Sequence, residues 1–157
     1  MNIRFATKED VPAILHLIKA IADYEKLLHE VTATEEILYD SLFVKKAAEV
    51  LLGEYDGKII GFALFFHNFS TFTGKRGLYL EDLFVLPEYR HQGFGKQFFF
   101  ELMQLAQQRE CGRMEWICLD WNAPAIRFYT DYLGAIPMDE WTVYRLSEKK
   151  IADFFLR

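Results

Sequence analysis

A glycine-containing segment separates an apolar, strand-like run ending at Pro87 from a helical pattern. Residues 88–96 read Glu-Tyr-Arg-His-Gln-Gly-Phe-Gly-Lys. Gly93 and Gly95 lie where the helix should begin, and glycine lets the backbone approach a ligand that a Cβ would keep away. Backbone N–H groups and the helix dipole at such a start attract anions. The segment therefore predicts a site for a phosphate-bearing group.

Two common phosphate-binding motifs do not fit this segment. A Walker A loop needs a glycine five positions before Gly95 and a hydroxyl residue after Lys96, but Arg90 and Gln97 stand there. A dinucleotide-binding fingerprint needs a third small residue where the chain has Phe98. Both motifs are excluded, and the pattern that remains is Arg90-x-x-Gly93-x-Gly95.

This pattern, following the run 83–87, resembles the acetyl-CoA pyrophosphate loop of the GNAT superfamily of N-acetyltransferases. Segments 78–85 and 121–129 resemble the spermidine/spermine, or diamine, acetyltransferase branch, and the similarity covers nearly the whole chain. The resemblance implies a GNAT fold and acetyl-CoA as co-substrate. It also implies direct transfer of the acetyl group to a primary amine.

Direct transfer places two demands on the protein. The amine attacks only as the free base, so a proton must leave the ammonium, and the departing thiolate must be protonated or stabilised. Glu81 lies in an apolar strand, where desolvation tends to raise the pKa of a carboxyl group toward that of a useful base. The resemblance places Tyr129, on the helix after Asn122, near the thioester sulfur as general acid. Glu81 and Tyr129 are therefore the predicted catalytic residues.

The resemblance also implies a set of binding residues. Backbone N–H groups around Phe84 and Val85, where GNAT folds splay two parallel strands, would polarise the acetyl carbonyl. The predicted coenzyme contacts are Leu83, Phe84, Val85, Arg90, His91, Gln92, Gly93, Phe94, Gly95, Lys96, Asn122, Ala125 and Tyr129. The predicted amine contacts are Tyr24, Glu25, Glu81, Asp82 and Asp139.

Many of these residues also have an ordinary structural explanation. Glu81 and Asp82 could be a charge pair that protects an edge strand, and Tyr129 could be a core aromatic. Asn122 before Pro124 would make a good helix N-cap. A solvated surface position would explain four more residues: Tyr24, Glu25, Arg90 and Lys96.

The elements that would position these residues follow from hydrophobic periodicity. Strands are expected at 2–6, 48–55, 58–67, 78–86, 114–120 and 141–146, and helices at 7–25, 34–43, 95–109 and 122–133, with a last helical turn at 151–156. Thr7 and Asp10 resemble a capping box, and Asp56-Gly57 is a strong hairpin signal. This order predicts an α/β (α+β) fold, a mixed and mostly antiparallel sheet with helices on both faces, in one domain over 1–157.

Composition limits the function classes. With 157 residues, 52% of them hydrophobic, the chain can bury a sizeable core. Its net charge of −5 disfavours nucleic acid as a partner, and no run approaches the 18 apolar residues of a membrane span. Cys111 and Cys118 indicate neither a disulfide framework nor a zinc site. We expect a cytoplasmic protein without a metal or a membrane partner.

Two functions stay open at this point. The first is an N-acetyltransferase for a diamine, a polyamine or a lysine-like amine, and the second is a non-catalytic acyl-CoA-binding sensor or regulatory module. The presence of Glu81 and Tyr129 favours the enzyme. The resemblance further implies a homodimer.

Overall fold

The computed structural model describes residues 1–156 and contains two compact units, 1–117 and the part from Cys118 onward. The first unit contains β1 (Asn2–Phe5), α1 (Val11–Tyr24), α2 (Glu35–Tyr39), β2 (Glu49–Tyr55), β3 (Lys58–Ser70), β4 (Lys75–Val85), α3 (Phe94–Gln108) and β5 (Met114–Trp116). A 3-10 turn (Lys8–Asp10) precedes α1, and a π-helical turn (Asp40–Val44) follows α2. The prediction of one domain over the whole chain stays a prediction.

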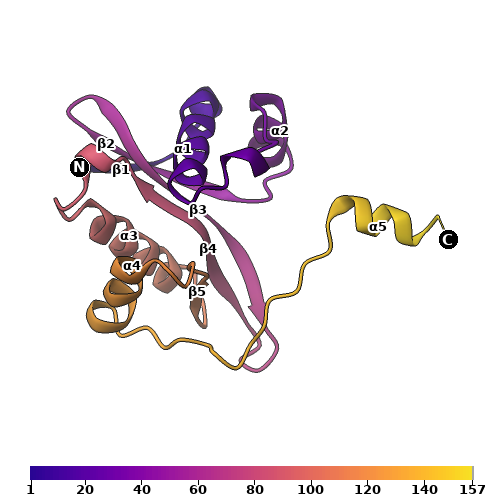
Figure 1. Cartoon of the computed structure of the whole chain (residues 1–157). Coiled ribbons are helices and arrows are strands. Elements are labelled where there is room, and N and C mark those ends of the chain that lie inside the picture. The colour runs from indigo at the N-terminus through magenta and orange to yellow at the C-terminus, as the bar shows by residue number, and fades with distance from the viewer. Residues whose placement is uncertain (157) are drawn as a thin grey trace. The chain divides into compact units, whose positions relative to one another are not determined.

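The first unit is built on one five-stranded sheet in the order β1-β2-β3-β4-β5. Its strands are antiparallel except for β4 and β5, which are parallel. α1 and α2 lie on one side of this sheet and α3 on the other (Figure 1). The predicted fold class, a mixed and mostly antiparallel sheet with helices on both faces, is confirmed.

The hydrophobic core between α1 and the sheet follows a helical spacing of apolar residues along α1. Val11, Ile14, Leu17 and Ile21 recur on one face of α1, and all four are buried. They belong to one cluster with side chains of the sheet: Val50, Leu52, Phe62 and Phe84. Each such side chain contributes about 1.5–3 kcal/mol of burial free energy, so this layer holds α1 on the sheet.

A β-bulge interrupts the pairing of β3 with β4. The register passes from Phe65↔Leu80 to Leu64↔Asp82, which leaves Glu81 as an extra residue in β4. Because β3 keeps its alternation, Leu64 and Phe65 face opposite sides of the sheet, and so do their partners Asp82 and Leu80. Leu64 packs against the core cluster beneath α1. Asp82 therefore faces α1, whereas Leu80 faces the opposite side.

The hairpin between β2 and β3 confirms the predicted turn. Asp56 and Gly57 both have positive φ values, 51° and 71°. This conformation suits the right-handed twist of the flanking strands.

The second unit contains α4 (Ala123–Arg127), a π-helical turn (Phe128–Tyr132) and α5 (Glu148–Phe154). The helix predicted over 122–133 is thus confirmed, and Gly134 follows it with φ 70°. The last helix begins earlier than predicted because the Ser147 side chain accepts a hydrogen bond from the backbone N–H of Lys150.

Two strand predictions need correction. The strand predicted over 114–120 is shorter and ends at Trp116. The strand predicted over 141–146 is wrong, because that segment joins no strand within residues 1–156. Alternation of apolar and polar residues suits a segment for a sheet, but the segment forms a strand only when it hydrogen-bonds to a neighbouring strand.

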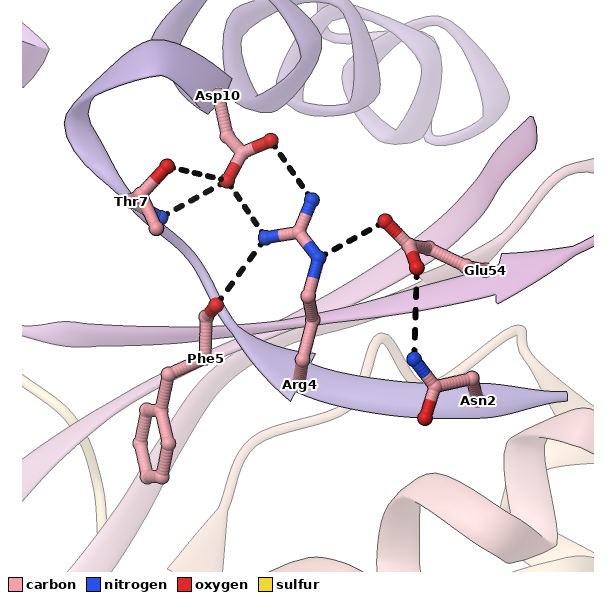
Figure 2. Close-up of polar contacts among 6 residues, drawn as sticks. All are labelled: Asn2, Arg4, Phe5, Thr7, Asp10 and Glu54. Carbon is pink, nitrogen blue, oxygen red and sulfur yellow. Dashed lines mark hydrogen bonds and ion pairs between the residues drawn. The ribbon is translucent and has the colours of Figure 1, made fainter. Parts of the chain in front are cut away.

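A polar network fixes the start of α1 to the sheet (Figure 2). The Arg4 guanidinium donates through Nη1 and Nη2 to the two carboxylate oxygens of Asp10, at 2.7 and 2.9 Å, and through Nε to Glu54 at 2.8 Å. Asp10 also accepts from the backbone N–H of Thr7 at 2.8 Å, which is the carboxylate half of the predicted capping box. These bonds join β1, β2 and the first turn of the helix.

The charge of Asp10 should make the fold sensitive to acid. The hydrogen bonds from Arg4 hold the pKa of Asp10 well below its usual value. Since the folded-state pKa is depressed, the stabilisation is present above the unfolded value of about 3.9 and is lost as the pH falls below it. We expect Asp10→Asn to lower the free energy of unfolding at pH 7 by about 1–3 kcal/mol.

Urea denaturation at pH 7 and pH 3 measures this effect. The difference between wild type and Asp10→Asn should shrink at pH 3. Asp56→Asn is the matched control, because Asp56 is an exposed turn residue where asparagine is equally suitable. A loss of stability in Asp10→Asn that is as large at pH 3 as at pH 7 contradicts the assignment to the ion pair.

Candidate active site

Three carboxylates meet where α1 ends and β4 passes its bulge. Asp82 is half-buried, and burial, followed by the charges of Glu81 and Glu25, raises its pKa to about 6. Burial also raises the pKa of Glu25, which immediately follows α1. Glu81, the predicted base, is exposed. The desolvation that motivated the choice of Glu81 therefore acts on Asp82.

This difference has a structural cause that no sequence signal marks. Glu81 and Asp82 are neighbours in an apolar run, so either side chain could face the core. The bulge at Glu81 turns Asp82 toward α1 and Glu25. Sequence reasoning identified both carboxylates as amine contacts but gave the proton-accepting role to the exposed one.

An aromatic and cationic cluster adjoins the carboxylates. The Arg90 guanidinium lies 4.5 Å from the centroid of the Tyr24 ring and 5.0 Å from that of the Phe84 ring. Arg90 Nε also donates to the carbonyl oxygen of Val85 at 2.9 Å. The end of β4, the last residue of α1 and the start of the glycine segment are thus held together.

The glycine segment forms the start of α3, as predicted. His91 and Gly93 have positive φ values of 63° and 81°, and Gly93 is the N-cap residue. The first helical bond runs from the Gln97 N–H to the Gly93 carbonyl at 3.2 Å. The N–H groups of Phe94 and Gly95 precede this bond, so helix geometry gives them no partner within the helix. They can bind an anion in front of α3.

Not every side chain of the segment faces a ligand. Phe94 is buried, and its ring centroid lies 4.9 Å from that of Tyr55. His91 and Gln92 are exposed. The side chain of Phe94 therefore anchors the segment, and its contribution to anion binding lies in the backbone.

Gly95 has no packing or conformational reason to be glycine. A Cβ built there meets nothing within 4 Å, and Gly95 is not among the glycines with positive φ. At Gly61, in contrast, a Cβ would lie 2.5 Å from the Phe84 carbonyl oxygen. A glycine inside a helix costs about 0.5–1 kcal/mol relative to alanine. The open space beside Gly95 fits the close approach of a phosphate group.

The outer edge of β4 supplies two further N–H groups. Its pairing with β5 ends at Leu80↔Trp116, while β4 continues to Val85. Because the Leu86 N–H donates to Ile60 of β3, strand alternation directs the N–H groups of Leu83 and Val85 away from β3. Phe84 instead turns its N–H toward β3.

Lys96 is exposed near the start of α3, and the other predicted site residues not yet described belong to the second unit. Asn122 is at the N-cap position of α4, yet its side chain makes no capping hydrogen bond; its carbonyl accepts from the Ile126 N–H. Ala125 lies within α4, and Tyr129 lies in the π-helical turn, 5.8 Å from Phe128 between ring centroids. Asp139 is in the turn before Trp141. Their roles in catalysis and binding stay predictions.

Within residues 1–156, no group of three or more His, Cys, Asp or Glu side chains could hold a metal ion. No helix in this described part has the length and apolar character of a membrane span.

A helix start that can accept an anion, near a strand edge with outward-directed N–H groups, is the arrangement expected of an acyl-coenzyme-dependent transferase. Residues 13–135 match the model of the Acetyltransferase (GNAT) family, so the chain belongs to the GNAT family of acetyltransferases. It is an N-acetyltransferase, and the non-catalytic sensor is not favoured. Enzymes of this family use acetyl-CoA as acyl donor.

Relatives that cover nearly the whole chain act on amines. The chain is 33% identical to L-ornithine N5-acetyltransferase of Arabidopsis thaliana, over 93% of this chain and 84% of that protein. It is 36% identical to thialysine N-epsilon-acetyltransferase of Bos taurus, over 91% of this chain and 90% of the relative. Both are N-acetyltransferases, as predicted for this chain.

Solved structures agree on the fold. An integron cassette protein of V. cholerae superposes with a TM-score of 0.80 at 23% identity, covering 98% of this chain and 96% of that one. An aminoglycoside acetyltransferase from a soil metagenomic sample gives a TM-score of 0.78 at 19% identity, covering 93% and 96%.

A substitution of Gly95 should have opposite effects on the stability of the protein and on its affinity for acetyl-CoA. We expect Gly95→Ala to raise the free energy of unfolding by about 0.5–1 kcal/mol, because alanine favours the helix and meets open space. The same methyl group should weaken acetyl-CoA binding about tenfold or more by keeping the pyrophosphate from the helix start. Urea denaturation and isothermal titration calorimetry with acetyl-CoA measure the two effects.

The matched control is Gln104→Ala, at an exposed position within the same helix. It should leave acetyl-CoA affinity unchanged. Unaltered affinity in a stabilised Gly95→Ala protein would remove the helix start from the coenzyme site.

Proposed function

We propose that this enzyme acetylates the terminal primary amine of a small, flexible molecule that carries a second cationic group. Diamines, polyamines and basic amino acids such as ornithine or thialysine belong to this class, and acetyl-CoA is the donor. The observation that carries the proposal is the carboxylate cluster of Glu25, Glu81 and Asp82 beside the outer edge of β4. The names of the ornithine and thialysine enzymes among the relatives support it.

Asp82 is the proposed base. With a pKa of about 6 it is mostly ionised at neutral pH, yet it is more basic than an ordinary carboxylate. It takes the proton from the bound ammonium, directly or through water, and thereby frees the nitrogen lone pair. Glu25 and Glu81 supply the negative charge that attracts and holds a dication. Tyr24 and Asp139 complete the proposed amine contacts.

The coenzyme groups follow from the backbone. When bound, acetyl-CoA supplies the acetyl group as a thioester. The helix start with Gly93 and Gly95 holds its pyrophosphate, and the N–H groups of Leu83 and Val85 polarise the acetyl carbonyl. Tyr129 is the proposed acid that protonates the departing thiolate, and Asn122 and Ala125 are proposed coenzyme contacts.

The proposal extends to the setting of the enzyme. We infer a cytoplasmic homodimer whose partners are small molecules, with neither nucleic acid nor membrane as a ligand. The similarity to the diamine acetyltransferase branch supports the homodimer, and the acidic charge of the chain supports the absence of nucleic acid.

An amine panel tests the function. Release of the coenzyme A thiol should be observed with thialysine, ornithine and spermidine, and the KM of a monoamine of similar length should be about tenfold higher. The KM of the dications should rise with salt, because the Debye length falls from about 10 Å at 0.1 M to about 3 Å at 1 M. No turnover with any amine contradicts the proposed function. Equal KM values for mono- and dications, without salt dependence, contradict the second charge alone.

The pH profile of kcat/KM tests the base. Below its pKa, Asp82 is protonated and accepts no proton, so activity should fall as the pH drops below about 6. We expect Asp82→Asn to lower kcat by roughly 10²–10⁴ and to abolish this limb. Titration of the amine substrate adds a limb at higher pH that all variants share.

Glu81→Gln is the matched control, because it removes the neighbouring exposed charge. It should raise the KM of the amine and keep the limb near pH 6. A profile that loses its acidic limb in Glu81→Gln and keeps it in Asp82→Asn would restore Glu81 as the base.

A further inference from the structure

Arg90 belongs to a motif expected to bind phosphate, yet its side chain is committed to the protein. Its Nε donates to the Val85 carbonyl at 2.9 Å. Its guanidinium lies over the rings of Tyr24 and Phe84, at 4.5 and 5.0 Å from their centroids. The two rings are themselves 6.2 Å apart between centroids. One side chain therefore contacts the ends of α1 and β4 from the start of the glycine segment.

This arrangement does not suit a phosphate ligand. Bidentate recognition of a phosphate uses the planar fork of the guanidinium, whose orientation is restricted here by contact with two rings and by the bond from Nε. The glycine segment also has another means of binding an anion, the N–H groups at the start of α3. The pyrophosphate therefore does not require the Arg90 side chain.

The contacts of Arg90 are instead with residues beside the proposed amine site. Tyr24 is the last residue of α1, and Glu25, whose charge acts on Asp82, directly follows it. Val85 offers both the carbonyl that Arg90 binds and an N–H at the open edge of β4. A shift of Arg90 would therefore displace the end of α1 and the end of β4 together.

We propose that Arg90 is a positioning residue that aligns the amine-binding end of α1 with the acetyl-binding end of β4, and that it does not bind the coenzyme phosphates. This inference rests on the proposed function. Its chemical content is that a cation in contact with two aromatic rings sets the distance between the attacking amine and the acetyl group. Such alignment affects turnover and the KM of the amine more than the affinity for acetyl-CoA.

Arg90→Lys tests the proposal because it keeps the charge but loses the planar group. An ammonium does not reproduce both the stacking on two rings and the bond from Nε to Val85. We expect the ratio kcat/KM for the amine to fall about 30-fold or more, while the Kd of acetyl-CoA from calorimetry changes less than threefold. Amine kinetics like those of the wild type in this variant would overturn the proposal.

Arg90→Gln removes the positive charge and therefore distinguishes a positioning role from a phosphate-binding role. A phosphate-binding arginine would contribute to the salt dependence of acetyl-CoA affinity, so its loss would weaken binding and flatten that dependence. We expect the Kd of acetyl-CoA and its change between 0.05 and 0.5 M salt to match those of Lys58→Gln, a control that loses one exposed positive charge elsewhere. A Kd raised tenfold with a flattened salt dependence would instead assign Arg90 to the phosphates.

A double-mutant cycle of Arg90→Lys with Tyr24→Leu adds a readout that needs no catalysis. If Arg90 acts through Tyr24, Arg90→Lys should have a smaller effect in the Tyr24→Leu background than in the wild type. We expect its effects on the unfolding constant and on kcat/KM to differ between the two backgrounds by about threefold or more. Tyr24→Phe, which keeps the ring, should preserve the coupling. Additive effects would overturn the proposal. Absent amine turnover in the wild type would refute the proposed function, while coupling in the unfolding constant would still report the Arg90 contact.

Discussion

The side of the sheet that the Asp82 carboxyl group faces depends on one extra residue in β4. Without the bulge at Glu81, Leu80 and Asp82 would face the same side of the sheet, because strand side chains alternate. The bulge lets Leu80 stay in the core on one side while Asp82 turns toward α1 on the other. A carboxyl group is thereby half-buried beside two others without interrupting the apolar layer. The bulge costs one pair of the β3–β4 ladder and places the group whose pKa rises into the range where a base is useful.

The end of β4 also bears on how an acidic protein can bind both an anion and a cation. In the proposed function, a chain with a net charge of −5 binds an anionic coenzyme and a cationic amine at neighbouring places. Backbone groups make this possible, because the N–H groups at the start of α3 and along the open edge of β4 attract anions without adding a cationic side chain. In the proposed function, the carboxylates then contact only the amine. Arg90, from the glycine segment, contacts two aromatic rings and a backbone carbonyl.

The sequence predicted what depends on local pattern. The face of α1 that is buried, the turn at Asp56-Gly57 and the helix start at Gly93 follow from spacing and glycine chemistry within a few residues. The facing of Asp82 depends on how β4 pairs with β3, and no residue type marks a bulge in advance. The strand expected at 141–146 failed for a related reason, since its alternation says nothing about whether a partner is present. Arg90 was placed correctly in the glycine segment, but its contact with Tyr24 comes from α1, more than sixty positions earlier.

The carboxylate cluster illustrates how function opposes stability at this site. Burial of Asp82 adds a desolvation cost, and Glu81 and Glu25 repel its charge, so the folded state disfavours ionisation of Asp82. The same repulsion is what makes Asp82 a better base than an isolated carboxylate. In the proposed function, a bound dication relieves this repulsion, because its positive charges neutralise the excess negative charge of the cluster. In the proposed function, the site selects its substrate by charge: a molecule that does not neutralise the cluster leaves the repulsion in place, whereas one with two ammonium groups neutralises it and presents one nitrogen to Asp82.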